Sequence, residues 1–283
     1  MGCCDDENLR SRRQCKMMER SGIITLLTDF GQQDGYVGAM KGVMLGLHPT
    51  VRLIDISHEV EPQNVHAGAF LLEAHFRYFP PGTVHLAVVD PGVGSERAAL
   101  ACYADEHFFI APDNGLLDFC LDFSNLQVVR LTQPQYWRQK ISATFHGRDL
   151  FAPVAAHLAA GESLAHLGEL AALQRRRPRL DCRIDGKTLH GQVVYSDRFG
   201  NLISNISTPC LREFSQDQPV TIYLAGHLIG GLSKSYADVP PHTPLALIGS
   251  FGFLEIAVNL SNARLHFAAR YGTPIAVERG QMI

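Results

Sequence analysis

The stretch HLAVVDPGVGSER, residues 85–97, runs an apolar segment directly into a turn that carries charge. HLAVV predicts a β-strand, and PGVG predicts a turn, because proline presets φ near −65° and glycine tolerates positive φ. Turn chemistry leaves Asp90 and Arg97 unexplained. A carboxylate that closes a strand and a guanidinium seven residues later are therefore candidates for a functional role.

The residues before this strand alternate between strand and helix patterns. GIITLLTDF (22–30) and VRLIDIS (51–57) are β-branched, leucine-rich strand segments, and residues 36–47 and 65–78 have the apolar spacing of helices. This order predicts an N-terminal α/β domain with a central, largely parallel sheet covered by helices. Three more strands are expected at 99–104, 107–112 and 126–131, and one more helix at 151–161.

The second half of the chain has a different texture. Short alternating segments, such as LISNIS, PVTIYLAG and FLEIAVN, are separated by Gly, Pro and Asn turns. This pattern predicts a smaller C-terminal antiparallel β-barrel domain. The expected divisions are a disordered polar tail over 1–21, the α/β domain over 22–174, a linker over 175–182 and the barrel over 183–283.

The composition restricts the classes of function. The formal charge of −3 includes no basic excess for binding nucleic acid through its phosphates. No apolar run is long enough to span a membrane, and the first twenty residues lack the apolar middle of a signal peptide. The seven cysteines contain no CxxC pair, so neither a zinc ribbon nor a disulfide framework is indicated. We expect a cytoplasmic protein with no membrane or nucleic-acid partner.

Several polar residues stand where ligands bind in α/β folds. Asp29, Asp55 and Asp90 close or nearly close strands, and open α/β sheets bind ligands beyond the carboxyl ends of their strands. Asp29 suits hydrogen bonds to a ribose diol. Each aspartate could equally be a turn or helix cap. His146, in ATFHGRDLFAP, has no metal-ligand spacing around it, so no metal site is expected.

The second half offers three further polar candidates. Asp197 and Asn201 lie in YSDRFGNLISN, and Ser250 lies in GSFGFLEIAVN. All three could simply fill β-turn positions for conformational reasons.

Seven segments taken in order resemble one family. It is the S-adenosyl-L-methionine (SAM) hydrolases (adenosine-forming), also called SAM hydroxide adenosyltransferases, which are related to fluorinase and chlorinase. The resemblance covers about residues 23–277. The segments are TDFGQQDGYVGAMKG, DISHEVEP, FPPGTVHLAVVDPGVGSER, FIAPDNGLL, TFHGRDLFAPVAAHLAAG, SDRFGNLISNI and GSFGFLEIAVN.

The resemblance implies hydrolysis of SAM to adenosine and L-methionine, with SAM as substrate and no cofactor. It implies a homotrimer whose sites lie between one subunit's N-terminal domain and a neighbour's C-terminal domain. Asp90, Arg97 and His146 match the family's catalytic triad, which handles the attacking water. The residues that match substrate contacts are Asp29 for the ribose hydroxyls, Phe145 along the substrate, Asp197 for the methionine ammonium, Asn201 for adenine and Ser250 near the methionine carboxylate.

Two alternatives stay open at this point. A SAM-dependent halogenase is disfavoured because those relatives have an uncharged residue in place of Asp90 and no histidine in place of His146. A non-catalytic SAM- or adenosine-binding protein would have no need of a water-activating group. One departure from the family is Phe251, where fluorinase relatives carry arginine and many hydrolases a small polar residue. It leaves open how the substrate carboxylate is held.

The implied reaction explains these residue types. SAM carries a sulfonium, so methionine leaves as a neutral thioether and needs no general acid. The reaction lacks a nucleophile, since water with a pKa of about 15.7 is scarcely ionised at neutral pH. We expect the proton to leave water during attack, with Asp90 or His146 as acceptor and Arg97 orienting the water.

Overall fold

The computed structural model describes residues 19–177 and 181–280. The chain forms two compact units, unit 1 (Met1–Arg177) and unit 2 (Pro178–Ile283). The boundary lies within the linker expected over 175–182, of which residues 178–180 fall outside the described part. Most of the expected polar tail, residues 1–18, also falls outside it. Arg20 already packs on unit 1: its side chain donates to the carbonyls of Leu158 and Glu162 and lies over the Phe108 ring.

Unit 1 is built on one seven-stranded sheet of order β2-β1-β3-β5-β4-β6-β7. The four strands β2, β1, β3 and β5 are parallel, and β4, β6 and β7 join them by antiparallel pairing. The α/β fold class is confirmed, with the parallel strands at one side of the sheet. The strands are β1 (Ile23–Thr28), β2 (Arg52–Ser57), β3 (Val84–Val88), β4 (Ala99–Ala104), β5 (His107–Pro112), β6 (Gln127–Leu131) and β7 (Gly168–Leu170).

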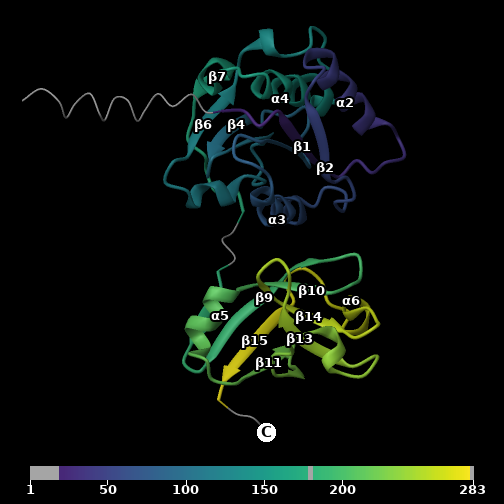
Figure 1. Ribbon diagram of the computed structural model, residues 1–283, viewed down its shortest axis with the longest axis vertical. Coiled ribbons are helices and arrows are strands. Elements are labelled where there is room, and N and C mark those ends of the chain that lie inside the picture. The colour runs from purple at the N-terminus through teal and green to yellow at the C-terminus, as the bar shows by residue number, and fades with distance from the viewer. Residues whose placement is uncertain (1–18, 178–180, 281–283) are drawn as a thin grey trace, which may run out of the picture. The chain divides into compact units, whose positions relative to one another are not determined.

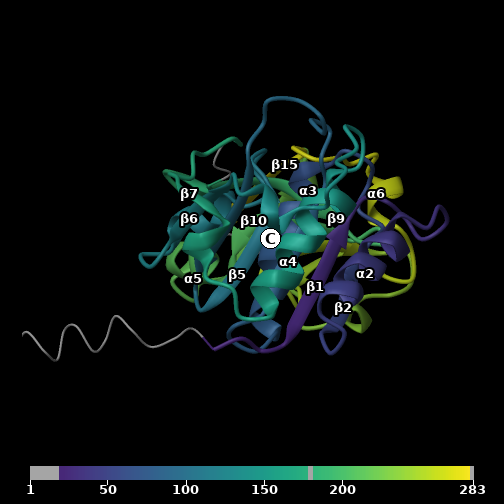
Figure 2. The ribbon, with the colours of Figure 1, turned by 90° about the horizontal axis from the view of Figure 1, so that it is seen from above.

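Helices cover both faces of this sheet. Every residue of β1 is buried, as expected for a central parallel strand. On one face Ile24 and Leu26 share a core cluster with Met40 of α2 and Phe151 and Val154 beside or in α4. Figure 1 shows α3 on the opposite face, and Figure 2 looks onto the α2 and α4 face, where these helices flank the line of β1. The helices are α2 (Tyr36–Leu47), α3 (Val65–His75) and α4 (Ala152–Ala159), with short turns η1 (Phe76–Tyr78), η2 (Asp118–Asp122), η3 (Pro134–Tyr136), η4 (Gly147–Phe151) and η5 (Leu164–Leu167).

Unit 2 is an antiparallel sheet that nearly closes into a barrel. Its strand order is β12-β11-β15-β9-β10-β14-β13, with β8 paired to β9. Beyond the end of β12, Leu232 bridges to Ala246 of β13, which brings the two edges of the sheet together. The elements are β8 (Arg183–Asp185), β9 (Thr188–Ser196), β10 (Leu202–Ser207), α5 (Thr208–Ser215), β11 (Val220–Leu224), β12 (His227–Gly230), η6 (Tyr236–Asp238), β13 (Pro244–Ile248), β14 (Phe253–Val258), α6 (Ala263–His266) and β15 (Pro274–Arg279).

Three features differ from the sequence expectations or add to them. The helix expected over 151–161 begins earlier, as the π-helical turn η4, and its α-helical part ends at Ala159. Cys182 and Cys210 form a disulfide in unit 2. The spacing of the cysteines in the sequence did not indicate this bond. Within the described ranges, no helix is both long and apolar enough to cross a membrane.

A pair of histidines is buried in unit 1, away from the polar turn after β3. His85 of β3 lies 2.7 Å from Thr25 Oγ1 through Nδ1 and 3.0 Å from His107 Nδ1 through Nε2. Its ring stacks on Phe109, with centroids 5.1 Å apart. Burial, and secondarily the charge that His107 can carry, lowers the pKa of His85 well below its usual value. Burial also lowers the pKa of His107. Both rings are therefore held neutral in the folded state.

We predict that unit 1 loses stability as the pH falls below about 6.5, the pKa of an unfolded histidine. Because the folded pKa is lowered, the stabilisation is complete above this pH and is lost below it, by up to about 1.4 kcal/mol per pH unit for each group. Urea unfolding from pH 7.5 to 5.0, followed by the fluorescence of Trp137, the single tryptophan, measures this slope. His85→Gln should flatten it. Equal slopes in the parent and His85→Gln would contradict the prediction.

Candidate active site

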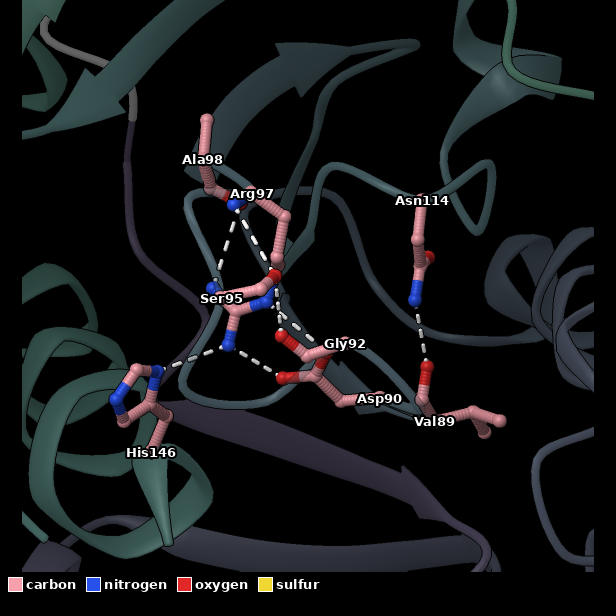
Figure 3. A network of polar contacts seen from close by, with 8 residues as sticks. All are labelled: Val89, Asp90, Gly92, Ser95, Arg97, Ala98, Asn114 and His146. Carbon is pink, nitrogen blue, oxygen red and sulfur yellow. Dashed lines mark hydrogen bonds and ion pairs between the residues drawn. The ribbon is translucent and has the colours of Figure 1, made fainter. Parts of the chain in front are cut away.

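The chain from Asp90 to Arg97 folds back on itself directly after β3. Val93 N–H donates to the Asp90 carbonyl at 3.2 Å, and Ser95 N–H donates to the Gly92 carbonyl at 3.1 Å. The Ser95 hydroxyl donates to the Gly92 carbonyl at 2.7 Å and accepts from Arg97 N–H at 3.3 Å. These successive turns bring the Arg97 side chain back to Asp90, as Figure 3 shows.

Arg97 and Asp90 form a two-pronged ion pair that is nearly closed to solvent. Arg97 Nε donates to Asp90 Oδ1 at 2.9 Å, and Arg97 Nη2 donates to Asp90 Oδ2. The two side chains are only 10% and 4% exposed, and the guanidinium lies over the Phe151 ring at 5.2 Å. Such a pair fixes both the position and the plane of the guanidinium.

His146 joins this pair from a loop 49 residues further along the chain. It stands immediately before η4, and Asp149 in that turn secures the loop. The buried Asp149 carboxylate accepts from the side chains of Arg148 and Arg138 and from Ser142 N–H. The hydrogen bonds from Arg148 contribute most to lowering its pKa, which falls to about 2. The loop that carries His146 is thus held by an ionised side chain across the neutral pH range.

A glycine lets the two loops meet. Gly94 has a φ of 79°, and a Cβ at this position would lie 2.5 Å from the carbonyl oxygen of Ala143. A side chain here would therefore push the loop of Asp90 and Arg97 away from the loop of His146. The glycine serves this contact as well as the turn.

The contact between Arg97 and His146 decides where the imidazole proton lies. Arg97 Nη2 is 2.9 Å from His146 Nδ1. Since a guanidinium only donates, Nδ1 accepts, and the proton of the neutral ring is on Nε2. Burial first, and then the charge of Arg97, lowers the pKa of His146, against opposing contributions from Asp90 and Asp149. The ring therefore presents an N–H donor through Nε2.

Asp29 reaches the same edge of the sheet as Asp90. β1 and β3 pair in parallel with Thr28 opposite Val88, so the two aspartates follow neighbouring strands at their carboxyl ends. The Asp29 carboxylate accepts from Gln63 N–H through Oδ2 at 2.7 Å. Asp55, the third strand-end candidate, lies inside β2, and its carboxylate is bound by Lys41 at 2.7 Å.

Phe145, which precedes His146 in the chain, lines an open hollow. Its ring packs edge-on against Phe30 and Tyr36, at centroid distances of 6.0 and 5.2 Å, and Arg148 lies over its face. The hollow has a volume of about 320 Å³, and Ser142 and Thr144 also line it. Aromatic walls with a few polar groups are typical of small-molecule sites.

In unit 2, Asp197 and Asn201 occupy the turn between β9 and β10. The Asn201 backbone N–H donates to Asp197 Oδ1 at 2.8 Å, and the Asn201 side-chain amide donates to Asp197 Oδ2 at 3.0 Å. Ser250 lies in the turn between β13 and β14, where Gly252 N–H donates to the Gly249 carbonyl at 2.9 Å. All three residues therefore occupy turns, as the conformational explanation of these residues expects. A position in a turn does not conflict with a ligand-binding role.

The sequence reasoning missed two residues of unit 2, Glu255 and Tyr236. Glu255 is only 5% exposed and accepts a hydrogen bond from the Tyr236 hydroxyl at 2.6 Å. Burial raises the pKa of Glu255, and the nearby Asp197 adds to this rise. A Cβ on Gly249 would lie 2.3 Å from Glu255 Oε2, so Glu255 also borders the turn of Ser250. The available signal was an acidic residue in the middle of the apolar strand FLEIAV.

The candidate residues belong to both units. The described residues contain no group of three or more His, Cys, Asp or Glu side chains placed to hold a metal ion. The structure brings Asp90, Arg97 and His146 into one network. It places Phe145 next to His146 in the chain and Asp29 at the same edge of the sheet as Asp90. Asp197, Asn201 and Ser250 belong to unit 2.

Two family models match the chain. The SAM hydroxide adenosyltransferase N-terminal domain matches residues 24–168, and the C-terminal domain of the same family matches residues 191–276. The chain belongs to the SAM hydroxide adenosyltransferase family.

Hydrolase and fluorinase relatives, and a solved structure, are similar to this protein over nearly the whole chain. The (R)-S-adenosyl-L-methionine hydrolase of Salinispora arenicola is 38% identical over 263 residues, which cover 91% of this chain and 98% of the relative. A fluorinase of Nocardia brasiliensis is 28% identical over 297 residues, with 92% and 98% covered. The crystal structure of an uncharacterized conserved protein from Thermotoga maritima is 35% identical, covers 90% of this chain and all of its own, and superposes with a TM-score of 0.84.

Membership in the SAM hydroxide adenosyltransferase family confirms the resemblance seen in the sequence. The match to both domain models spans the turn of Asp90 and Arg97, the loop of His146 and the turn of Asp197 and Asn201. Roles for individual residues stay predictions from the resemblance to the family.

Proposed function

We propose that the protein hydrolyses SAM to adenosine and L-methionine. Water oxygen attacks C5′ as the C5′–S bond breaks, methionine leaves as a neutral thioether, and one proton passes to the protein and then to solvent. The observation that carries this proposal is the single, partly buried network of Asp90, Arg97 and His146 in a chain of the SAM hydroxide adenosyltransferase family. Relatives named (R)-S-adenosyl-L-methionine hydrolase, at 33–39% identity, support it.

The barrier to forming hydroxide limits what the network can do. Moving water from its pKa of about 15.7 to neutrality costs roughly 12 kcal/mol at about 1.36 kcal/mol per unit. A neighbouring positive charge typically shifts a pKa by about 1 to 3 units. Arg97 therefore holds no standing hydroxide, and the proton must leave during attack. Alignment of water and C5′ in one site can contribute about 7 to 11 kcal/mol.

Asp90 is the better candidate for the proton acceptor. His146 accepts from Arg97 through Nδ1 and carries its proton on Nε2, so neither nitrogen offers a free lone pair. Each oxygen of Asp90 accepts one hydrogen bond from Arg97, and a carboxylate oxygen has room for a second. In this proposal Asp90 takes the proton, His146 Nε2–H holds the water oxygen, and Arg97 fixes both partners.

The substrate contacts follow the family pattern. Asp29 binds the ribose hydroxyls, Phe145 lies along the substrate, Asp197 meets the methionine ammonium, Asn201 meets adenine and Ser250 lies near the methionine carboxylate. The apolar Phe251 cannot supply the cation that fluorinase relatives place after this serine, so the Ser250 hydroxyl is the side-chain donor that this turn offers. SAM is the substrate, no cofactor takes part, and we place the reaction in the cytoplasm.

We further propose a homotrimer, in which unit 1 of one subunit and unit 2 of a neighbour bind the same SAM molecule. The support is that substrate-binding candidates are carried by both units. Size-exclusion chromatography with light scattering should give three times the subunit mass. A monomeric mass at the concentration of the activity assay would contradict this arrangement.

The decisive experiment is product analysis after incubation with SAM in ¹⁸O-labelled water. We predict adenosine and methionine in equal amounts, with the label in the adenosine 5′-hydroxyl. Added chloride or fluoride should give no 5′-halo-adenosine. A halogenated product would favour the fluorinase-like alternative, S-adenosylhomocysteine would indicate a methyltransferase, and no product would favour a binding protein.

Substitution of the network should lower turnover while SAM binding is retained. Asp90→Asn removes the acceptor with little change of shape, and loss of a general base typically costs about 100-fold to 10,000-fold. His146→Ala removes one donor to the water, which typically costs about 100-fold or more. Steady-state kinetics and calorimetric SAM binding separate the two effects. Asp122→Asn, at a half-exposed aspartate of the same unit, is the control. Parental turnover in both site variants would refute the assignment.

A further inference from the structure

A line of polar side chains, buried at Thr28 and His58 and partly exposed at Asp55 and Lys41, lies next to the turn that carries Asp29. Thr28 ends β1, and its hydroxyl is 2.8 Å from His58 Nδ1. His58 Nε2 lies 3.0 Å from Asp55 Oδ1, and Lys41 Nζ donates to Asp55 Oδ2 at 2.7 Å. Thr28 is fully buried and His58 is 2% exposed, so this line is closed to solvent at its inner end.

The direction of each contact follows from the donor groups. Lys41 only donates, so the Asp55 carboxylate accepts from it. Asp55 Oδ1 also lies 3.0 Å from His58 Nε2, and a carboxylate oxygen at this place favours the tautomer with its proton on Nε2. His58 Nδ1 then accepts from the Thr28 hydroxyl. Thr28 Oγ1 in turn accepts from Phe30 N–H at 3.2 Å. Burial acts to raise the pKa of Asp55, but the hydrogen bonds from Lys41 and His58 outweigh it and the pKa is lowered. The chain of contacts thus ends on the backbone immediately after Asp29.

Two more bonds tie the same turn to the loop of His58. Gly31 N–H donates to the His58 carbonyl at 2.8 Å, and Gln63 N–H donates to Asp29 Oδ2 at 2.7 Å. Gln63 has a φ of 66°, a left-handed conformation that costs energy for a residue other than glycine. The turn over 28–31 is therefore held from one side at three points. Of the two Asp29 carboxylate oxygens, Oδ2 accepts from Gln63 N–H, and Oδ1 has no hydrogen bond from any described residue.

Packing alone does not explain why a polar residue, Thr28, occupies this buried position. Valine has the same shape as threonine, suits a strand and needs no hydrogen-bond partner. A buried hydroxyl and imidazole are favourable only when both are satisfied. Compared with an apolar core, these polar side chains provide one further feature: an oriented hydroxyl that accepts from Phe30 N–H.

We propose that Thr28, His58 and Asp55 are positioning residues that aim the Asp29 carboxylate at the ribose diol of the substrate. This inference rests on the proposed function, because it assumes that Asp29 binds the diol. The three residues act through the backbone of the turn and touch no substrate. They determine selectivity for a ribonucleoside over nucleosides that lack the 2′- and 3′-hydroxyls.

The test compares the binding of adenosine with that of 2′,3′-dideoxyadenosine by calorimetry, which needs no turnover. A carboxylate that holds the diol should favour adenosine by roughly 10- to 100-fold, and Asp29→Asn should abolish this preference. Thr28→Val should reduce the preference to within about threefold by weakening adenosine while dideoxyadenosine binding stays unchanged. A general loss of stability would weaken both ligands alike.

Matched variants complete the experiment. Thr28→Ser keeps the hydroxyl and should restore the preference. Thr132→Val is the control, since the buried Thr132 hydroxyl has no hydrogen-bond partner in the described part of unit 1. Asp55→Asn, at a partly exposed position, should lower the preference even if Thr28→Val folds poorly. Combined with Asp29→Asn, Thr28→Val should have no further effect on the preference.

The outcomes separate this inference from the proposed function. If the parent prefers adenosine and both Thr28→Val and Asp55→Asn keep that preference, the positioning role is wrong while the proposed function stands. If the parent releases adenosine from SAM but binds both nucleosides equally, the diol contact of Asp29 and its positioning residues are refuted together. If the parent produces no adenosine, the proposed function itself fails, whatever the nucleoside preference.

Discussion

The buried ion pair between Arg97 and Asp90 is the constraint on which the rest of the site depends. Two charges that are 10% and 4% exposed are stable only because each faces the other, and loss of either partner would leave a charge uncompensated in a dry environment. The pair fixes the guanidinium, and the guanidinium in turn fixes the ring of His146. The position and the protonation of the histidine are therefore consequences of the ion pair.

The sheet of unit 1 provides the place for this pair. Parallel pairing of β1 and β3 puts Asp29 and Asp90 at one edge, and the close approach of Gly94 to Ala143 admits the loop of His146. The sheet itself is held by apolar burial on both faces of β1. Loops that bear charge thus follow strands β1 and β3, in which every residue is buried.

Beside the site, buried polar side chains are connected to charged side chains that are partly exposed. Lys41, Asp55, His58 and Thr28 form one line, and Asp149 with its two arginines forms another. Both lines end at a loop that carries a candidate site residue, Asp29 in the first case and His146 in the second. In unit 2, Tyr236 and Glu255 form a smaller set next to Asp197. The cost of burying these groups is offset by hydrogen bonds that also give the loops a fixed direction.

The sequence by itself determined the elements and the identity of the central residues. Periodicity predicts the strands at 99–104 and 107–112 and the helix at 36–47, and these have the predicted bounds in the structure. Motifs in a conserved order of the family pointed to Asp90, Arg97 and His146. Only the tertiary structure decided that His146 accepts through Nδ1, that His58 supports the turn of Asp29, and that Glu255 borders Asp197. The physical reason is that these properties depend on contacts between residues far apart in the chain: 49 positions for Arg97 with His146, 30 for Thr28 with His58 and 19 for Tyr236 with Glu255. Local sequence patterns carry no information on such partners.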